Sequence, residues 1–260
     1  MSKTRLFQAV KSLDLDSTRE ILESQPGLLH VRDNKGWNLL HLACSADCRE
    51  LKVPEARAVQ MADYLLDRGI DIESTNVSDK VCDSMPVIWF AVCRGRNHTL
   101  VKHLIQRGAK PMGLYAAGWW QDLEILDTLI QAGAEIDVTG GFTPFLACWC
   151  WKKFEAAKLL AKRGADVNLQ DPKTGKTALH YGIEREFDPS LLKWLVQHGA
   201  LTGIRDKDGT TPLEMASRKR NKRFFDALTA SASAGAAQAV RSRRRRESSR
   251  SDTRSRRDGS

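Results

Sequence analysis

The sequence lacks the features that mark membrane and secreted proteins. Its 260 residues contain no run of about 18 apolar residues, so we expect no segment that spans a membrane. The first residues lead into an amphipathic segment with acidic side chains, where a signal peptide would have a hydrophobic stretch. The six cysteines have no disulfide-framework spacing, which in a chain without a signal indicates a reducing compartment. These absences favour a cytoplasmic protein.

Motifs for catalysis or cofactor binding are also missing. Gly140 and Gly141 precede Phe142 and a candidate helix start, and they do not form the strand-to-helix turn of a phosphate loop. Cys148 and Cys150 are separated by one residue, whereas a redox motif has two intervening residues. No Cys and His pair has a third orienting group that would support nucleophilic catalysis. We therefore expect no enzymatic activity, no catalytic residue and no cofactor.

What the sequence does contain is a four-residue unit that recurs six times with drift. Its clearest copies are Thr-Ala-Leu-His at 177–180 and Thr-Pro-Leu-Glu at 211–214, and weaker copies lie at 38–41, 86–89, 112–115 and 143–146. Five copies are followed by Gly-Ala or Gly-Ile, at intervals of 28, 19, 18, 18 and 19 residues. The distance from that glycine to the next copy varies between 7 and 20 residues. A packed helix pair tolerates little change in length and a connecting loop tolerates more, so the pattern indicates an array of helix pairs.

The residue types within each unit agree with helix pairs. Thr143, Thr177 and Thr211 are residues that cap helix N-termini, and Pro144 and Pro212 follow at the first helical position, where a missing N–H costs nothing. The closing glycines suit a left-handed C-cap at the end of a second helix. Between motif and glycine, apolar residues recur at helical spacing.

Together these strings resemble the ankyrin repeat, whose landmarks include Thr-Pro-Leu-His-x-Ala and Gly-Ala-Asp-Val-Asn; the latter occurs unchanged at 164–168. The resemblance implies an all-α solenoid of stacked helix-turn-helix repeats with β-turn fingers, an α-α superhelix. It covers residues 1–228 in about six units, with a diverged first unit at 6–33 and a truncated last helix. The first motif repeat carries about ten extra residues around 47–54, and the third has essentially no finger.

The resemblance also bears on the one grouping that could bind a metal ion. His41, Cys44 and Cys48 lie at i, i+3 and i+7, along one face of a helix, and Cys93 could add a fourth ligand. In the ankyrin motif, however, the imidazole at this position hydrogen-bonds within the turn, and Cys44 would fill a small buried site. We expect no metal site.

The basic charge is concentrated at the end of the sequence. The formal net charge is +9, and residues 231–260 contribute +6 of it through nine arginines. This segment has almost no bulky apolar residue, so we expect 229–260 to form a disordered Arg/Ser-rich tail. The run Arg243–Arg246 could be a nuclear import signal, and Arg241–Arg257 could bind nucleic acid weakly and nonspecifically or tether the protein to an anionic membrane. A solvated tail without a partner is the alternative.

The resemblance predicts where a protein partner would bind. In the family, the last residues of each first helix and the fingertips line a concave groove. The partner contacts expected here are Trp37, Arg94, Trp119, Trp120, Phe142, Trp151, Arg185 and Arg218. Tryptophan and arginine are the commonest binding hot spots. Trp119 and Trp120 could instead cover the helix ends of the repeat without a finger, and Trp89 and Trp149 are expected in the core.

Our interpretation is a non-catalytic, monomeric binding module whose rigid surface recognises an unidentified protein partner. Two alternatives remain open. The chain could be a nucleic-acid-associated or nucleus-directed protein that acts through its basic tail, or a regulatory or inhibitory subunit of an enzyme.

Overall fold

The computed structural model of the chain describes residues 2–76, 84–138, 141–219 and 222–229. Over these residues the fold is all-α, as the sequence predicted, and extended chain pairs only at an isolated bridge between Thr75 and Pro86. The chain divides into two compact units, Met1–Glu135 and Ile136–Ser260, a division that the sequence pattern did not predict. The last described helix ends at Thr229, and the arginine-rich segment 230–260, with the tail predicted there, lies outside the described residues.

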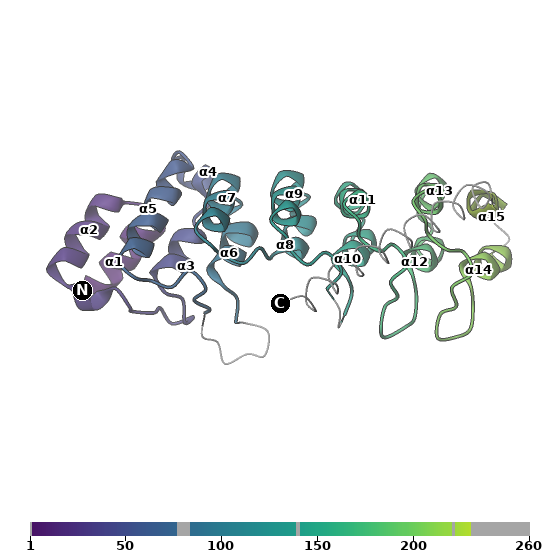
Figure 1. Cartoon of the computed structure of the whole chain (residues 1–260), viewed down its shortest axis with the longest axis horizontal. Coiled ribbons are helices and arrows are strands. Elements are labelled where there is room, and N and C mark those ends of the chain that lie inside the picture. Colours follow the sequence, from purple (N-terminus) through teal and green to yellow (C-terminus); the bar gives the residue numbers. More distant parts are fainter. Residues whose placement is uncertain (1, 77–83, 139–140, 220–221, 230–260) are drawn as a thin grey trace, which may run out of the picture. The chain divides into compact units, whose positions relative to one another are not determined.

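Each unit consists of helix pairs in chain order (Figure 1). The first unit contains α1 (Ser2–Lys11) with α2 (Leu15–Ser24) and the turn η1 (Pro26–Leu28); α3 (Leu39–Cys44) with α5 (Ala56–Asp67); α6 (Val87–Phe90), continued by the π-helical turn η2 (Ala91–Gly95), with α7 (His98–Gln106); and α8 (Leu114–Trp120) with α9 (Leu123–Gln131). The second unit contains α10 (Pro144–Cys150) with α11 (Phe154–Lys162); α12 (Ala178–Glu184) with α13 (Pro189–Gln197); and α14 (Pro212–Arg218) with α15 (Lys222–Thr229).

The described residues therefore form seven helix pairs, one more than the approximately six units expected. The diverged segment 6–33 forms a complete pair, α1 and α2. The extra residues around 47–54 form a short additional helix, α4 (Cys48–Leu51), in the connection between α3 and α5. The insertion thus lengthens one connection and leaves the pair intact.

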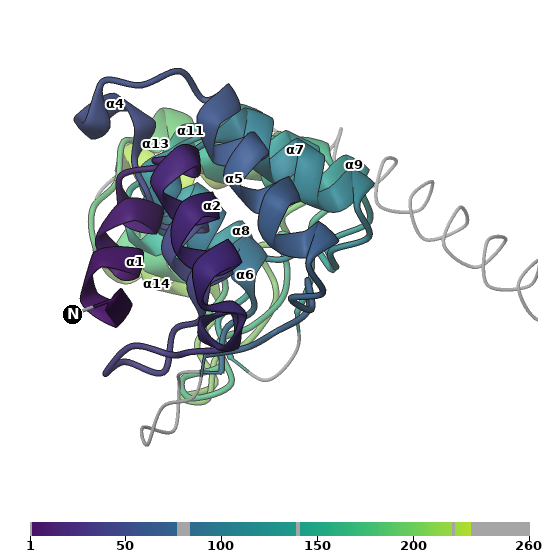
Figure 2. The ribbon, with the colours of Figure 1, turned by 90° about the vertical axis from the view of Figure 1, so that its left-hand side faces the viewer.

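Within each unit the helices form two layers. In the first unit, α2, α5, α7 and α9 lie side by side in one layer, and the first helices of the same pairs form the other (Figures 1 and 2). In the second unit, α12 packs on both α10 and α14, and α13 packs on α15. Because each first helix packs on the first helix of the next pair within its unit, with α8 packing on η2, side chains at corresponding positions of these helices become neighbours.

Threonine precedes all three first helices of the second unit, and proline follows it in α10 and α14, as predicted. Thr143 Oγ1 accepts a hydrogen bond from the Leu146 N–H at 3.2 Å, and Thr211 Oγ1 accepts one from the Glu214 N–H at 3.2 Å. The Thr211 N–H in turn donates to the Glu214 carboxylate, which completes a capping box. These side chains satisfy N–H groups that the helix itself leaves without acceptors.

The histidines of the motif connect neighbouring pairs. In the second unit, His180 Nδ1 accepts from the Thr177 N–H at 3.1 Å, so Nε2 carries the proton and donates to the Thr210 carbonyl at 3.0 Å. In the first unit, His41 Nδ1 accepts from the Asn38 N–H and Nε2 faces the Met85 carbonyl at 3.4 Å. Each imidazole therefore caps its own helix and reaches the backbone just before the next pair.

The cores combine aliphatic side chains with one aromatic cluster. Trp149 is fully buried, as predicted, and its ring meets Phe154 and Phe187 edge-on at centroid distances of 5.3 and 5.9 Å. A side chain at Gly182 would not fit in this core, because an added Cβ would lie 2.4 Å from Leu192 Cδ2. Trp89, also predicted in the core, is only half-buried, although Val87, Ile88 and Phe90 of the same short helix α6 are buried.

We predict that the end of α11 requires glycine at position 164 because of the backbone conformation there, and not because a side chain would clash. Its φ is 103°, and no heavy atom lies within 4 Å of an added Cβ, so substitution introduces strain without a clash. Gly164→Ala should lower the free energy of unfolding by about 1–2 kcal/mol in urea melts. Gly203→Ala is a matched control, because Gly203 lies in the same unit, has open space around it and lacks a positive φ. Equal stability of the two variants would contradict the C-cap role.

His41 should make folding depend on pH. Burial lowers the pKa of His41 from 6.5 to about 4, because protonation would charge a desolvated ring whose Nδ1 already accepts a hydrogen bond. Below pH 6.5 the unfolded chain binds this proton first, so stability is complete above that pH and falls as the pH decreases. We expect a loss of about 2 kcal/mol between about pH 7 and about pH 5.

Urea unfolding of wild type and His41→Gln at the two pH values measures this contribution. The variant should be less stable at neutral pH and should show a smaller decrease in stability on acidification. His180, whose pKa is also lowered by burial, contributes with the same sign in both proteins and cancels in the comparison. Parallel pH dependences in wild type and variant would show that His41 does not carry the effect.

Candidate protein-binding surface

The eight residues predicted to contact a partner lie in two sets of four, one in each unit. The first unit holds Trp37, Arg94, Trp119 and Trp120, and the second holds Phe142, Trp151, Arg185 and Arg218. Most of them lie at or just after the last turn of a first helix. The two sets are described separately below.

The two tryptophans of α8 have large exposed surfaces. Trp119 and Trp120 occupy the last two positions of the helix and are 46% and 45% exposed. Trp120 also contacts the preceding pair, because its Nε1–H donates to the Cys93 carbonyl at 3.1 Å. The guanidinium of Arg96 lies over the same indole, 4.8 Å from its centroid. Trp120 is thus held in place while almost half of its surface faces solvent.

Trp37 lies in the loop before α3 and is half-buried. Its ring packs edge-on against Phe90 of α6 at a centroid distance of 4.7 Å. Lys35 Nζ and the Arg94 guanidinium lie 5.2 and 5.1 Å from the Trp37 centroid, which is within range of cation–π attraction. The structure therefore brings the predicted contacts Trp37 and Arg94 together.

The π-helical turn η2 positions the cations of the first unit. Arg94 belongs to η2, and Arg96 follows it with φ of 44°, in the left-handed region. Gly95 between them allows η2 to approach α3, since a Cβ there would lie 2.4 Å from the Cys44 carbonyl oxygen. A π-turn inside a helix is frequently found at functional sites. The sequence analysis missed Arg96 and Lys35, although each lies two residues from a predicted contact.

In the second unit, Arg185 ends α12 and is fixed by two contacts. Its Nη1 donates to the Cys150 carbonyl at 2.7 Å, and its guanidinium lies 5.2 Å from the Tyr181 ring centroid. Phe142 is half-buried, with its ring 5.9 Å from the same tyrosine. Tyr181, which sequence reasoning missed, thus joins two predicted contacts. Trp151 caps α10 and is 39% exposed.

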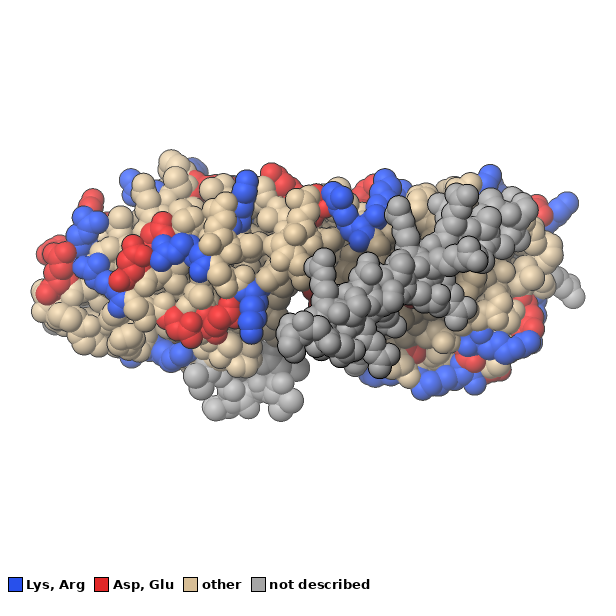
Figure 3. Space-filling model, in the orientation of Figure 1, with Lys and Arg blue, Asp and Glu red and all other residues tan. Residues whose placement is uncertain are grey.

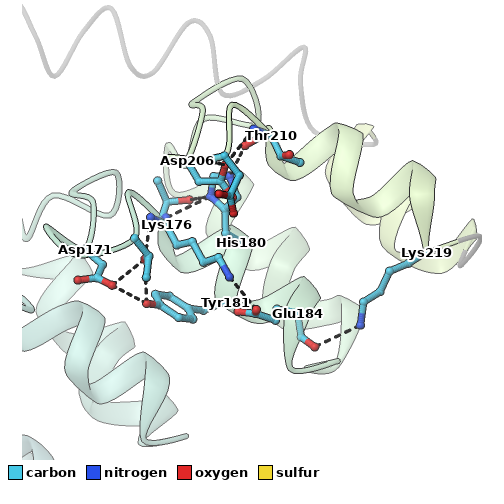
Figure 4. A network of polar contacts seen from close by, with 11 residues as sticks. Asp171, Lys176, His180, Tyr181, Glu184, Asp206, Thr210 and Lys219 are labelled. Carbon is cyan, nitrogen blue, oxygen red and sulfur yellow. Dashed lines mark hydrogen bonds and ion pairs between the residues drawn. The ribbon is translucent and has the colours of Figure 1, made fainter.

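Figure 4 shows the polar network that surrounds Tyr181. The phenol donates to Asp171 Oδ2 at 2.7 Å, and burial, the larger cause, raises the pKa of Tyr181 to about 12, so the hydroxyl is neutral at physiological pH. Lys176 pairs with Glu184 at 2.7 Å, and Lys219 Nζ donates to the Glu184 carbonyl at 3.2 Å. These contacts link α12 to its own finger and to α14.

Arg218 is not part of this cluster. Its Nη1 lies 3.3 Å from Thr210 Oγ1, and the side chain is exposed at the end of α14. Figure 3 shows Lys and Arg gathered along the lower edge of the second unit, below α12 and α14. Arg205 and Lys207 belong to the connection before α14. Both are engaged within the unit, since Arg205 pairs with Glu214 at 3.3 Å and Lys207 donates to the Pro172 carbonyl at 2.6 Å.

Most of the side chains considered for metal binding and catalysis lie in the core, whereas Cys93 is half-buried. Cys44 is fully buried, and burial raises the pKa of its thiol to about 12; the thiols of Cys148 and Cys150 have pKa values raised by burial to about 12 and about 11. Such thiols are protonated at neutral pH and are poor nucleophiles and poor metal ligands. Within the described ranges, no three His, Cys, Asp or Glu side chains converge as metal ligands would. None of the described helices is long and apolar enough to cross a membrane.

Comparison with known proteins identifies the repeats. The family model "Ankyrin repeats (3 copies)" matches residues 144–238. The chain is 28% identical over 212 residues to the nuclear factor NF-kappa-B p105 subunit of Gallus gallus, an alignment that spans 76% of this chain but only 20% of that protein. It is 25% identical over 238 residues to the "Probable 26S proteasome regulatory subunit p28" of Saccharomyces cerevisiae, spanning 86% of this chain and 98% of that protein.

Solved structures show the same fold. The ankyrin repeat domain of Bcl-3, described as a unique member of the IkappaB protein family, superposes with a TM-score of 0.69 at 23% identity, covering 86% of this chain and 97% of that domain. The human ASB11 ankyrin repeat domain superposes with a TM-score of 0.65 at 20% identity, covering 86% of this chain and 95% of that domain. The capped first helices, the glycine-terminated second helices and these matches agree: the chain is an ankyrin repeat protein.

Proposed function

We propose that this protein is a non-catalytic binding module that recognises a protein partner through the ends of its first helices and the adjoining fingers. The observation that carries the proposal is the exposure of Trp119, Trp120 and Trp151, which keep 46%, 45% and 39% of their surface accessible at the ends of α8 and α10. Ankyrin repeats are protein interaction modules, and indole rings dominate the energetics of many protein interfaces. Exposed aromatic surface of this kind is unfavourable in water unless a partner covers it.

The proposed contacts are rigid before binding. In the first unit, cations stack on Trp37 and Trp120, and in the second, Arg185 is held by Cys150 and Tyr181. A side chain that is already ordered loses little conformational entropy when a partner binds. Phe142, Trp151 and Arg218 extend the proposed surface of the second unit.

A second candidate function is that of a non-catalytic subunit within a larger assembly. The observation that favours it is the yeast relative, which matches along 98% of its own length and whose name describes a regulatory subunit of the 26S proteasome. The same surface would then bind a neighbouring subunit. Gel filtration of native extracts distinguishes the two candidates, since a subunit elutes mainly in a large complex and a module with a transient partner elutes mainly near its own mass of 29.1 kDa.

Loss of two tryptophans should abolish partner capture without unfolding the protein. Trp119→Ala/Trp151→Ala removes one exposed indole from each unit, and hot-spot truncations cost about 2 kcal/mol or more each. Affinity capture from cell extract with tagged protein measures the loss. Phe225→Ala is a matched control, because Phe225 is 39% exposed but lies on the second helix α15. Phe225→Ala should capture as much partner as the wild-type protein does.

Thermal melts of the same variants separate binding from packing. If the tryptophans serve mainly to cover helix ends, the double variant will show a large decrease in Tm, and the fraction that remains folded will still capture the partner. A double variant with unchanged Tm and unchanged capture would contradict the proposed surface.

A further inference from the structure

The cations around Trp37 and Trp120 suggest what kind of partner the first unit binds. We propose that Lys35, Arg94 and Arg96, stacked on these two indoles, form a site for an extended acidic peptide segment of a partner protein. We call these five residues the indole–cation cluster. The inference rests on the proposed function and specifies the chemistry of the partner at one part of its surface.

The first observation is that the positive charges of the cluster are not neutralised. None of its three cations forms an ion pair with a carboxylate among the residues that the structure describes. By contrast, other cations of this unit are paired: Arg49 with Asp47 at 2.7 Å, and Arg107 with Asp67 at 2.8 Å. The cluster therefore gathers like charge that a ligand of opposite sign would neutralise.

Asp33, two residues before Lys35 in the sequence, already has partners. Asp33 Oδ1 accepts the backbone N–H groups of Lys35 and Trp37 at 2.8 and 3.0 Å, so it shapes the turn. Arg32, beside it, donates to the carbonyls of Gly36 and Thr75. The negative charge of Asp33 is balanced by the positive charge of Arg32, so the cluster with these two neighbours stays positive. This charge favours an anionic ligand.

The second observation is an unsatisfied donor. Arg96 Nε is buried and has no hydrogen-bond acceptor, although its guanidinium lies over Trp120. A buried N–H without a partner is unfavourable relative to a satisfied one. A guanidinium that stacks flat on an aromatic ring still presents its N–H groups at its edge, where a carboxylate can bind them in pairs. Because Nε is buried, a carboxylate would pair with it only after the Arg96 side chain turns toward the ligand.

The geometry favours a peptide over a nucleic acid. Proteins that bind single strands offer open aromatic faces on which bases stack. Here cations already lie over the rings of Trp37 and Trp120, at 4.8–5.2 Å from their centroids, and stacking would have to displace them. The exposed surfaces of Trp119 and Trp120 instead suit the apolar side chains that lie between carboxylates in an acidic peptide. The partner segment is therefore acidic with interspersed bulky apolar residues.

Fluorescence anisotropy of labelled synthetic probes tests the site on the full chain. The probes are a peptide of alternating Glu and Leu, the same peptide with Lys for Glu, and a single-stranded oligothymidylate of equal negative charge. The acidic peptide should bind, the Lys peptide should not, and added salt should weaken binding. Arg94→Gln/Arg96→Gln should weaken acidic-peptide binding at least about tenfold, which corresponds to about 1.4 kcal/mol.

Matched variants separate the cluster from general charge. Arg57→Gln/Lys102→Gln removes two exposed cations from the second helices α5 and α7, and its affinity should stay within about twofold of wild type. If Arg96→Gln disturbs the left-handed turn, as circular dichroism would show, then Lys35→Gln/Arg94→Gln replaces it, because both residues are exposed and outside that conformation. This second variant should lose affinity to a similar extent.

Three results would overturn the inference. The first is that the acidic peptide does not bind. The second is that the control variant loses as much affinity for it as Arg94→Gln/Arg96→Gln does. The third is that the oligothymidylate binds more tightly than the acidic peptide and is weakened equally by the cluster variants. The capture assay with Trp119→Ala/Trp151→Ala keeps this failure distinct from failure of the proposed function. If that variant loses its partner while the acidic peptide does not bind, only the acidic specificity is wrong. If that variant keeps its partner while folded, the binding surface itself is wrong.

Discussion

The candidate surface depends on the tight turn that ends each first helix. In five pairs a non-glycine residue occupies the left-handed region at this turn: Leu13, Arg96, Gln121, Lys152 and Glu186, with φ between 44° and 61°. Lys52 has the same conformation at the end of the inserted helix α4. The conformation costs each of these residues about 1–2 kcal/mol relative to ordinary helical backbone. In return it reverses the chain within two to four residues, so the first helix stays short and its last side chains remain at an exposed edge.

The side chains at these strained turns contribute contacts that a glycine could not make. Arg96 covers Trp120 of the next pair, Lys152 Nζ lies 5.7 Å from the ring centroid of Phe187, and Glu186 pairs with Lys219 at 3.0 Å. Each contact joins one helix pair to the pair that follows. The strain of the turn is thus offset by interactions between repeats, and these interactions also orient the residues of the candidate surface.

Much of the repeat architecture could be predicted from sequence because its determinants are local. Thr143 and Thr211 cap helices through N–H groups three residues away, and Gly164 ends a helix through its own φ. Such features depend on a few neighbouring residues, so they leave a recognisable pattern in the sequence. The near-constant motif-to-glycine interval reflects the constant length of a helix pair. The diverged first unit, with weaker local signals, was recognised and included in the expected number of about six.

The tertiary structure alone decided the contacts between residues that are far apart in the sequence. The stacking of Arg96 on Trp120, the support of Arg185 by the Cys150 carbonyl, and the grouping of Phe142 with Tyr181 join residues that are 24–39 positions apart. The π-helical form of η2 and the division into two units depend on such contacts as well. The sequence by itself determined the helix pairs, their caps and the order of exposed tryptophans and arginines along the chain. Packing decided which of these side chains meet. Contacts between repeats are set by the stacking of helices, and they leave no pattern among residues that are neighbours in the sequence.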